Sequence, residues 1–271
     1  MNKSLISVVM ATYAGDDFGH LKLAIHSVLN QSYPNVELLI VCDGPIDFDR
    51  FSYLADLPTI VKVLYLNENS GPAVARNIGI NSATGDYVAI MDADDISLPS
   101  RLADQLNFLI THDLDLISSD LLIIDSEGVV TGIRKVPYDH NQIRNVAPLR
   151  CPMHNPSAFG KASLFKNLKY NPNLRVSEDY DLWVRALIEG YRLGNVGKPL
   201  VKYRQSSLSI YKRVGMKYAK GDLLVKLKAL YLSPRRLRPI YFCLACFSSL
   251  SRLLPPKFFY IIYKYRSTSI G

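Results

Sequence analysis

Asp92 and Asp94 are separated by one residue and follow directly on the apolar run of residues 87–91. This run is rich in strand formers, so we expect a β-strand that presents both carboxylates at its carboxyl end. Carboxylate oxygens are the ligands that hard cations such as Mg²⁺ and Mn²⁺ prefer, and these cations in turn bridge phosphates. The pair therefore indicates a metal site for a phosphate-bearing substrate, with a solvated acidic turn as the alternative.

The elements that would position this pair alternate between strands and helices. Continuous apolar runs predict strands, and apolar residues at helical spacing, or a Gly-Pro helix start, predict helices. The strands are expected at residues 5–11, 36–42, 60–66 and 87–91, and the helices at residues 21–30 and from residue 72 onward. This alternation is typical of an α/β fold with a mostly parallel sheet and helices on both faces.

Polar residues follow three of the predicted strands. Thr12 and Tyr13 come after the first strand, Asp43 after the second and Asp92 after the fourth. In a parallel α/β sheet the ligand crevice lies outside the carboxyl ends of the strands. We therefore expect these side chains to share one rim.

The pattern becomes mixed after residue 100. A helix is predicted at residues 102–110, a strand at 114–119, a hairpin from strands at 121–125 and 129–134, and a helix at 178–188. Glu178 and Asp179 fall in the first turn of the last helix, where the helix dipole favours negative charge even without a catalytic role. Trp183, the sole tryptophan, is available to the core.

The formal net charge of +8 is unevenly distributed along the 271 residues. Residues 201–271 contain 15 Lys and Arg against one acidic residue, Asp222, which leaves 17 Lys and Arg against 23 Asp and Glu in residues 1–200. The asymmetry indicates an acidic catalytic body and a cationic tail for an anionic partner. We expect a catalytic domain at residues 1–210 and a basic, aromatic-rich helical tail at 211–271.

The four cysteines are too few and too scattered for a disulfide framework, which favours a reducing, cytoplasmic compartment. Cys243 and Cys246 have redox or zinc spacing, but they lie in an apolar run without a second ligand pair, so we interpret them as structural or lipid-facing thiols. The apolar run at residues 5–11 is very short for a signal peptide and is interpreted as the first strand.

Two common phosphate-binding modes are excluded. The sequence has no Gly-x-Gly-x-x-Gly after the first strand and no Gly-x-x-x-x-Gly-Lys-Ser/Thr. Phosphates would instead be held by a metal on Asp92 and Asp94 together with Arg76, which lies on the helix that begins after Gly71.

Five motifs in register resemble those of family 2 glycosyltransferases with the GT-A fold. The resemblance covers roughly residues 4–205 and implies a Rossmann-like domain that moves a sugar from a nucleoside diphosphate, usually UDP, to an acceptor hydroxyl with inversion at the anomeric carbon. The motifs are Val9-Met-Ala-Thr12-Tyr13, Val41-Cys-Asp43-Gly44, Asn69-Ser-Gly71-Pro-Ala-Val-Ala75-Arg76-Asn77-Ile-Gly79, Asp92-Ala-Asp94-Asp95 and Glu178-Asp179-Tyr-Asp181-Leu-Trp183.

The resemblance also implies roles on the donor side. Thr12 and Tyr13 would line the nucleotide pocket, Asp43 would accept a hydrogen bond from the uracil ring, and Arg76 would face the base or the diphosphate. The donor would therefore be held by strand ends and by the helix that follows the third strand.

The same resemblance implies the metal ligands and the base. Asp92 would contact the ribose or a metal-bound water, and Asp94 would ligate Mg²⁺ or Mn²⁺ on the diphosphate, with Asp95 as a helper. Asp179 would act as the general base, and Glu178 would position the acceptor or that base.

Two further positions carry weaker implications. His154 matches a family position on the acceptor side, although a lone histidine is more often a hydrogen-bonded structural residue. Many members carry Tyr-Arg-x-His after the sheet, with a histidine that reaches the metal or the diphosphate, whereas this chain has Ser206 in that place. Arg204 is the candidate substitute that would contact the leaving diphosphate.

The tail lies outside the resemblance. A basic stretch at residues 234–239 precedes apolar residues 240–250, and an aromatic cluster follows at residues 258–263. Neither apolar run reaches the roughly 18 to 20 residues that span a bilayer. We expect short helices on an anionic membrane surface, or else packing of the aromatic residues on the body. No nucleic-acid partner is expected, because no such module is recognisable.

Membrane attachment would suit a glycan or polyprenyl-linked acceptor at the inner face of the plasma membrane, in bacterial surface polysaccharide synthesis such as O-antigen, capsule, exopolysaccharide or lipopolysaccharide core. Two alternatives stay open. A haloacid dehalogenase-type phosphatase also uses Asp-x-Asp after a strand, but near the chain start and with a later lysine and acidic pair. A non-catalytic nucleotide- or membrane-binding module is the other.

Overall fold

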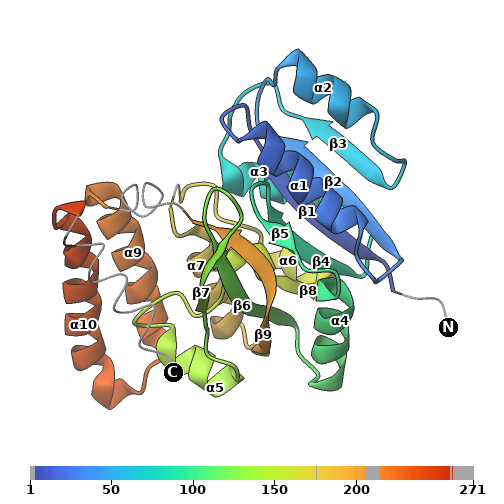
Figure 1. Ribbon diagram of the computed structural model, residues 1–271. Helices are drawn as coiled ribbons and strands as arrows, with labels where there is room; N and C mark the ends of the chain where they lie inside the picture. Colours follow the sequence, from blue (N-terminus) through green and yellow to red (C-terminus); the bar gives the residue numbers. More distant parts are fainter. Residues whose placement is uncertain (1–3, 175, 206–213, 257, 259–271) are drawn as a thin grey trace.

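The computed structural model describes residues 4–174, 176–205, 214–256 and 258. Strands and helices alternate through the first half, as predicted (Figure 1). The strands are β1 (Ile6–Thr12), β2 (Val36–Cys42), β3 (Val61–Tyr65), β4 (Tyr87–Asp92), β5 (Ile96–Ser97), β6 (Leu116–Ile124), β7 (Val130–Arg134), β8 (Phe159–Lys161) and β9 (Leu193–Arg204). The helices are α1 (Phe18–Leu29), α2 (Phe48–Ala55), α3 (Pro72–Ser82), α4 (Arg101–Thr111), α5 (His140–Val146), α6 (Ala162–Leu168), α7 (Glu178–Ile188), α9 (Met216–Ala229) and α10 (Arg238–Leu250), with short 3₁₀ turns between some of them.

The described strands form one sheet in the order β3-β2-β1-β4-β8-β6-β9-β5, with β7 paired to β6. The strands β3, β2, β1 and β4 are parallel to one another. In the second half, β8 is antiparallel to β4 and β6, whereas β6 and β9 are parallel. The predicted α/β sheet is thus confirmed, parallel in its first half and mixed in its second.

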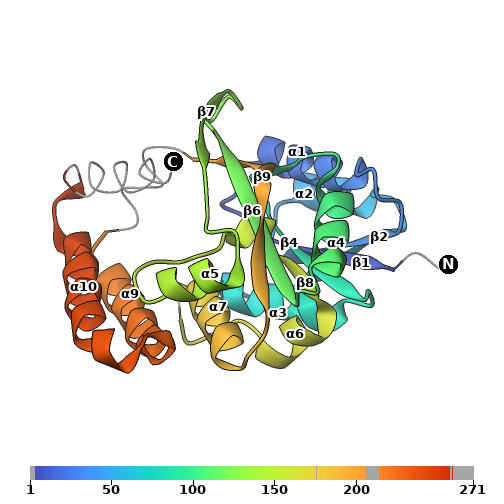
Figure 2. The same cartoon turned by 90° about the horizontal axis from the view of Figure 1, so that it is seen from below.

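Helices cover both faces of the sheet (Figure 2). Successive strand residues point to opposite faces, so Val9 packs towards α3, α6 and α7, while its neighbours Val8 and Met10 pack towards α1 and α4. Gly79 allows α3 to lie close to β1, because a Cβ atom at this position would stand 2.5 Å from a methyl carbon of Val9. Two buried layers, one on each face, therefore hold the parallel strands in place.

The second half differs from the sequence-based expectation in its strands, and α5, α6 and β8 were not predicted either. The strand predicted at residues 114–119 and the first arm of the predicted hairpin are one continuous strand, β6, while the hairpin itself is present as β6 and β7. Strand β9 was not predicted, because Gly194, Gly197 and Pro199 disfavour strand structure. The pairing of β9 with β6 accommodates these residues because the strand register shifts on both sides of Asp120.

The C-terminal helices form a pair beside the sheet. Helix α9 packs on the body, since Val225 and Ala229 belong to the same buried cluster as Trp183 of α7. Helix α10 packs on α9 (Figures 1 and 2). None of the helices that the structure describes combines the length and the apolar character that crossing a membrane requires. The predicted domain boundary at residue 210 and the aromatic cluster at residues 259–263 lie outside the described residues.

A buried carboxylate at the amino-terminal side of the sheet gives a testable pH dependence. Glu37 accepts hydrogen bonds from the Ser7 hydroxyl at 2.6 Å and from the Thr84 amide and hydroxyl at 2.7 Å each, and pairs with Lys62 at 2.8 Å. Burial alone would raise the pKa of Glu37, but these donors outweigh it and lower the pKa to about 2.

Glu37→Gln is therefore expected to reduce the free energy of unfolding at pH 7 by about 2 kcal/mol. Because the folded-state pKa lies below the unfolded value, this contribution is complete above about pH 4.5 and is lost as the pH falls towards 2. Urea unfolding of wild type and variant should show a difference at pH 7 that shrinks at pH 3. Glu127→Gln in the exposed β6–β7 turn is the matched control and should change little. A pH-independent difference would contradict the assignment.

Candidate active site

The carboxyl ends of β1, β2 and β4 meet as the sequence predicts. In the strand register, Thr12 lies beside Cys42 and Ala11 beside Asp92, and the Asp43 amide donates to the Thr12 carbonyl at 2.7 Å. The polar residues that follow these strands therefore share one edge of the sheet.

Asp43 is buried and supports the start of α3. Its Oδ1 atom accepts the Ser70 amide at 2.7 Å and its Oδ2 atom accepts the Gly71 amide at 2.9 Å. Gly71 has a φ of 92°, a left-handed conformation that favours glycine, and it precedes Pro72 at the first turn of the helix. Asp43 thus fixes the loop before α3. The contact of Asp43 with a uracil ring stays a prediction.

Asp16 is a further acidic residue at this edge that the motif analysis did not single out. Its Oδ2 atom accepts the Thr12 hydroxyl at 3.0 Å and the Tyr13 amide at 3.1 Å. Thr12 is buried and Tyr13 is half exposed, so Tyr13 is accessible for a ligand. Burial and the charge of Asp92 raise the pKa of Asp16, although its two donors act in the opposite direction. The position of Asp16, shortly after Thr12 and Tyr13 at the end of the first strand, is the sequence signal that could have identified it.

The acidic turn after β4 concentrates negative charge. Asp94 is exposed, and partial desolvation followed by the charges of Asp92 and Asp16 raises the pKa of Asp94 to about 6. Negative charge gathered in this way favours a bound cation. Among the residues that the structure describes, no group of three or more His, Cys, Asp or Glu side chains forms a metal-binding cluster. A Mg²⁺ site usually takes one or two carboxylates and completes its shell with phosphates and water, and the metal role of Asp92 and Asp94 stays a prediction.

Asp95 supports this turn from inside the protein. It is fully buried, its Oδ1 atom accepts the Arg204 amide at 2.8 Å, and burial followed by the charges of Asp94 and Asp92 raises the pKa of Asp95. The Arg101 guanidinium, also buried, donates to the Ile90 carbonyl at 2.7 Å, and its burial lowers the pKa of Arg101 to about 10. Asp95 therefore holds the end of β9 against this turn, and its role as a helper of the metal ligands stays a prediction.

Arg76 joins the two acidic motifs. Its guanidinium donates to Asp92 Oδ1 at 2.9 Å and to Glu178 Oε1 at 3.0 Å, and thereby brings the end of β4 next to the start of α7. Burial alone would lower the pKa of Arg76, but the charges of Asp92 and Glu178 outweigh it and raise the pKa. The Arg76 guanidinium carbon also lies 5.5 Å from the centroid of the Tyr170 ring.

Helix α7 presents Glu178 and Asp179 at its amino terminus. Ser177, which precedes the helix, has a φ of 62°, a left-handed conformation that costs energy in a residue other than glycine. Asp179 is half-buried and its Oδ1 atom accepts the Tyr180 amide at 2.7 Å. Glu178 is held by Arg76, and the role of Asp179 as general base stays a prediction.

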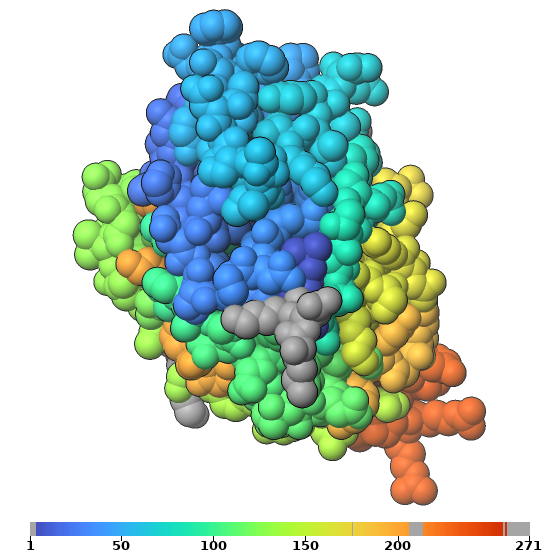
Figure 3. Space-filling view, turned by 90° about the vertical axis from the view of Figure 1, so that its right-hand side faces the viewer, coloured from blue at the N-terminus to red at the C-terminus, as the bar shows by residue number. Residues whose placement is uncertain are grey.

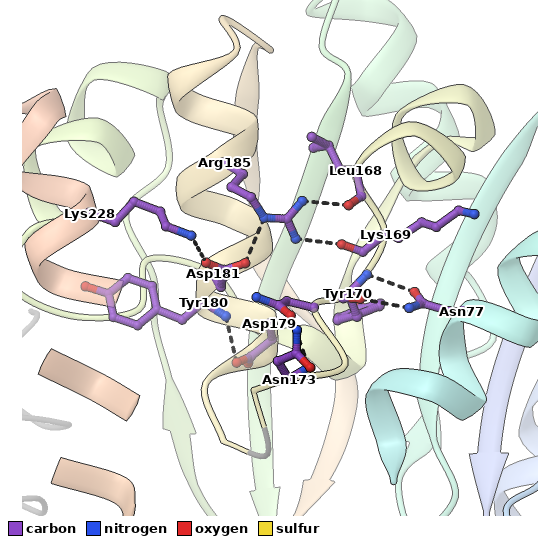
Figure 4. Close-up of polar contacts among 11 residues, drawn as sticks. Asn77, Leu168, Lys169, Tyr170, Asn173, Asp179, Tyr180, Asp181, Arg185 and Lys228 are labelled. Carbon is purple, nitrogen blue, oxygen red and sulfur yellow. Dashed lines mark hydrogen bonds and ion pairs between the residues drawn. The ribbon is translucent and has the colours of Figure 1, made fainter. Parts of the chain in front are cut away.

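Asp181, the third acid of α7, has a structural role (Figure 4). It is buried between Arg185, whose Nε atom lies 2.7 Å from it, and Lys228 of α9. Arg185 also donates to the carbonyl groups of Leu168 and Lys169 at 2.6 Å each. Asp181 therefore ties the start of α7 to α9, while Arg185 joins α7 to the end of α6.

His154 lies on the same side as Arg76. Its amide donates to the Ser118 hydroxyl at 3.2 Å, and the next residue, Asn155, accepts the Tyr170 hydroxyl at 2.7 Å. Tyr170 in turn lies under Arg76, which connects the segment of His154 to the acidic cluster. Sequence reasoning missed Tyr170, because an isolated tyrosine in a loop gives no recognisable pattern.

Arg204, at the end of β9, contacts backbone carbonyls. Its guanidinium donates to Asp94 at 3.0 Å, to Asp125 at 2.9 Å and to Ser126 at 2.7 Å. It therefore clamps the β6–β7 turn onto the acidic turn after β4. Its contact with a leaving diphosphate stays a prediction.

Removal of the Arg76 charge is expected to destabilise the protein. In Arg76→Met the carboxylates of Asp92 and Glu178 lose their common cation while staying largely buried, which should cost about 3 kcal/mol in the free energy of unfolding. Urea unfolding at pH 7 measures this. Arg192→Met, which removes a surface pair with Asp113, is the control and should cost less than about 1 kcal/mol. Equal effects of the two substitutions would show that the Arg76 bridge contributes little.

The sequence profile described as Glycosyl transferase family 2 matches residues 7–168. The chain is similar to the O-antigen biosynthesis glycosyltransferase WbnJ of Escherichia coli, with 32% identity over 214 residues that cover 77% of this chain and 82% of WbnJ.

Two solved structures share the fold. The crystal structure of S. aureus TarS 1–349 in complex with UDP-GlcNAc has a TM-score of 0.65 at 15% identity and covers 96% of this chain and 92% of that one. The mannosyltransferase PcManGT from Pyrobaculum calidifontis, in complex with GDP-Man and Mn²⁺, has a TM-score of 0.63 at 15% identity and covers 99% of this chain and 81% of its own.

Proposed function

The chain belongs to glycosyl transferase family 2, and we propose that it transfers a hexosyl or N-acetylhexosaminyl group from a UDP-sugar to a hydroxyl of a glycan or polyprenyl-linked acceptor, with inversion. The setting that we propose is bacterial surface polysaccharide synthesis on the cytoplasmic side of the plasma membrane. The name of the similar WbnJ protein supports this setting, and the UDP-GlcNAc complex of TarS supports a UDP donor.

One observation carries the proposal: Arg76 holds Asp92 and Glu178 on a single guanidinium group. This contact joins the acidic strand end, on the donor side, to the acidic helix start, on the acceptor side. A sugar held between them would have its phosphate bond facing the turn of Asp94 and the acceptor hydroxyl facing Asp179.

In the proposed reaction Asp179 takes the proton of the acceptor hydroxyl as that oxygen attacks the anomeric carbon. Glu178 stays ionised against Arg76 and orients the start of α7. A divalent cation on Asp94, with Asp92 beside it, would neutralise the charge that develops on the departing diphosphate. Thr12, Tyr13 and Asp43 would then form the nucleotide side of the site, and His154 the acceptor side.

A donor screen tests the proposal. The protein should be stabilised against heat by one UDP-sugar in the presence of Mn²⁺, since a ligand at 100 times its dissociation constant adds about 2.7 kcal/mol. Incubation of that donor with saccharide acceptors should then release UDP and add one sugar mass to the acceptor.

The same screen separates the alternatives. Donor binding without hydrolysis or transfer, across a broad acceptor panel, would favour a non-catalytic binding module. Phosphate release from simple phosphoesters without a sugar acceptor would favour phosphatase chemistry. Stabilisation by GDP-sugars but not UDP-sugars would overturn the proposed nucleotide while leaving the reaction class in place.

A further inference from the structure

The outward face of α10 is apolar although it is exposed to solvent. Large side chains lie on this face, while the small residues Ala245 and Ser249 are buried on the opposite face. The exposed apolar residues of this face are Ile240, Leu244, Phe247 and Leu250, joined by the exposed Cys243. Phe242 is exposed as well, near the start of the helix on the side of Ala245 and Ser249. This arrangement is the reverse of a helix that packs its apolar side inward, so the exposed face is suited to a partner.

Positive charge stands beside this face, not within it. Residues 239–250 contain no charged side chain, whereas Arg235 and Arg236, both exposed, lie in the short turn just before the helix. An apolar face next to arginines is typical of helices that lie in the interface of a membrane with anionic lipids.

Polar contacts hold α10 on α9 and α9 on the body, so the apolar face has a fixed position. Asp222 of α9 is buried and pairs with Lys226 at 2.5 Å and Arg252 at 3.2 Å, and it accepts the Ser249 hydroxyl at 2.8 Å. Burial would raise the pKa of Asp222, but Arg252 and Lys226 outweigh it and lower the pKa. The one acidic residue of the basic tail thus fastens α10 to α9, and the Asp181–Lys228 pair fastens α9 to the body.

The helix pair also lies away from the amino-terminal half. Helices α9 and α10 occupy the end of the molecule opposite α2 and β3 (Figures 1 and 2). In the view of Figure 3 the orange and red C-terminal residues project past the body at the lower right. A flat surface can therefore approach this end of the molecule.

We propose that α10 docks this face into the interface of an anionic lipid bilayer, with the helix axis parallel to the membrane plane. The helix has 13 residues and is about 20 Å long, which is shorter than the roughly 30 Å hydrocarbon core. Arg235 and Arg236 contact the anionic headgroups. A second copy of the chain is a poorer occupant, because two tails with 15 Lys and Arg against one acid each would be brought together. The inference adds a partner to the proposed function, and its test involves no sugar transfer.

Flotation of the full chain with vesicles tests the proposal. Wild type should float with phosphatidylglycerol–phosphatidylcholine vesicles and much less with phosphatidylcholine alone. Phe247→Asp should weaken binding at least about tenfold, because Phe247 is 72% exposed and would lose its insertion. Phe48→Asp in α2, where the side chain is 79% exposed at the other end of the molecule, is the matched control and should bind as wild type does.

A second variant measures how much the charges of Arg235 and Arg236 contribute to vesicle binding. Replacement of Arg235 and Arg236 by glutamine should weaken binding to the anionic vesicles by about 30-fold at low salt, at roughly fivefold per arginine. Equal flotation of wild type and Phe247→Asp, or an equal loss in Phe48→Asp, would overturn the proposal. A dimer that Phe247→Asp dissociates, with no vesicle binding by wild type, would overturn it too and would identify the face as a contact between copies.

Discussion

Asp179→Asn should lower the turnover of sugar transfer at least about 100-fold while donor binding stays close to wild type. General base assistance contributes on the order of 10² to 10⁴ in rate, and an amide cannot accept the acceptor proton. The neighbouring acid cannot readily take over, because Glu178 is held against Arg76 at 3.0 Å. Steady-state rates with saturating donor and acceptor measure the loss, and thermal stabilisation by the donor measures binding.

The control for this prediction is Asp181→Asn, two residues further along α7. Asp181 is buried between Arg185 and Lys228, so its replacement should lower stability and leave a larger share of the turnover in the folded protein. Full turnover in Asp179→Asn would eliminate Asp179 as the base and redirect attention to Glu178.

Asp94→Ala should lower transfer by about 1,000-fold and remove most of the dependence on Mg²⁺ or Mn²⁺. A cation that neutralises the leaving diphosphate contributes several kcal/mol, and each 1.36 kcal/mol changes the rate tenfold. Burial and the charges of Asp92 and Asp16 raise the pKa of Asp94, so the alanine variant should be at least as resistant to heat as wild type. Rates across a Mn²⁺ titration, and Mn²⁺ binding in the presence of UDP, check the result.

Asp56→Ala, at the exposed end of α2, serves as the control for the loss of one carboxylate. It should leave both rate and metal dependence unchanged. If Asp94→Ala kept wild-type transfer with the same response to Mn²⁺, the metal role proposed for the acidic turn would be wrong.

The parallel half of the fold could be predicted because each strand is a continuous apolar run that ends at a polar residue. Buried parallel strands have this pattern. Because the carboxyl ends of parallel strands meet at one edge of the sheet, Thr12, Asp43 and Asp92 are then expected on that edge. The strand register confirms this placement. The motif order was informative since the residues lie in separate segments that the sheet brings together.

The mixed half was less predictable because its strands depend on partners distant in sequence. Strand β9 contains Gly194, Gly197 and Pro199 and is held by pairing with β6. The contacts of Arg204 require the β6–β7 turn to fold over the acidic turn after β4, which no local pattern encodes. The contact of Arg76 with Glu178, 102 residues away, could likewise not be predicted from the spacing of residues in the sequence.

The burial of Trp183 gives this protein an intrinsic fluorescence probe. The sole tryptophan lies in α7, five residues after Glu178, and its indole N–H finds no hydrogen-bond partner among the described residues. An indole in such apolar surroundings emits at short wavelength, and emission shifts to the red when water reaches the ring. Displacement of α7 by a bound donor or acceptor can therefore be followed optically, without attaching a dye.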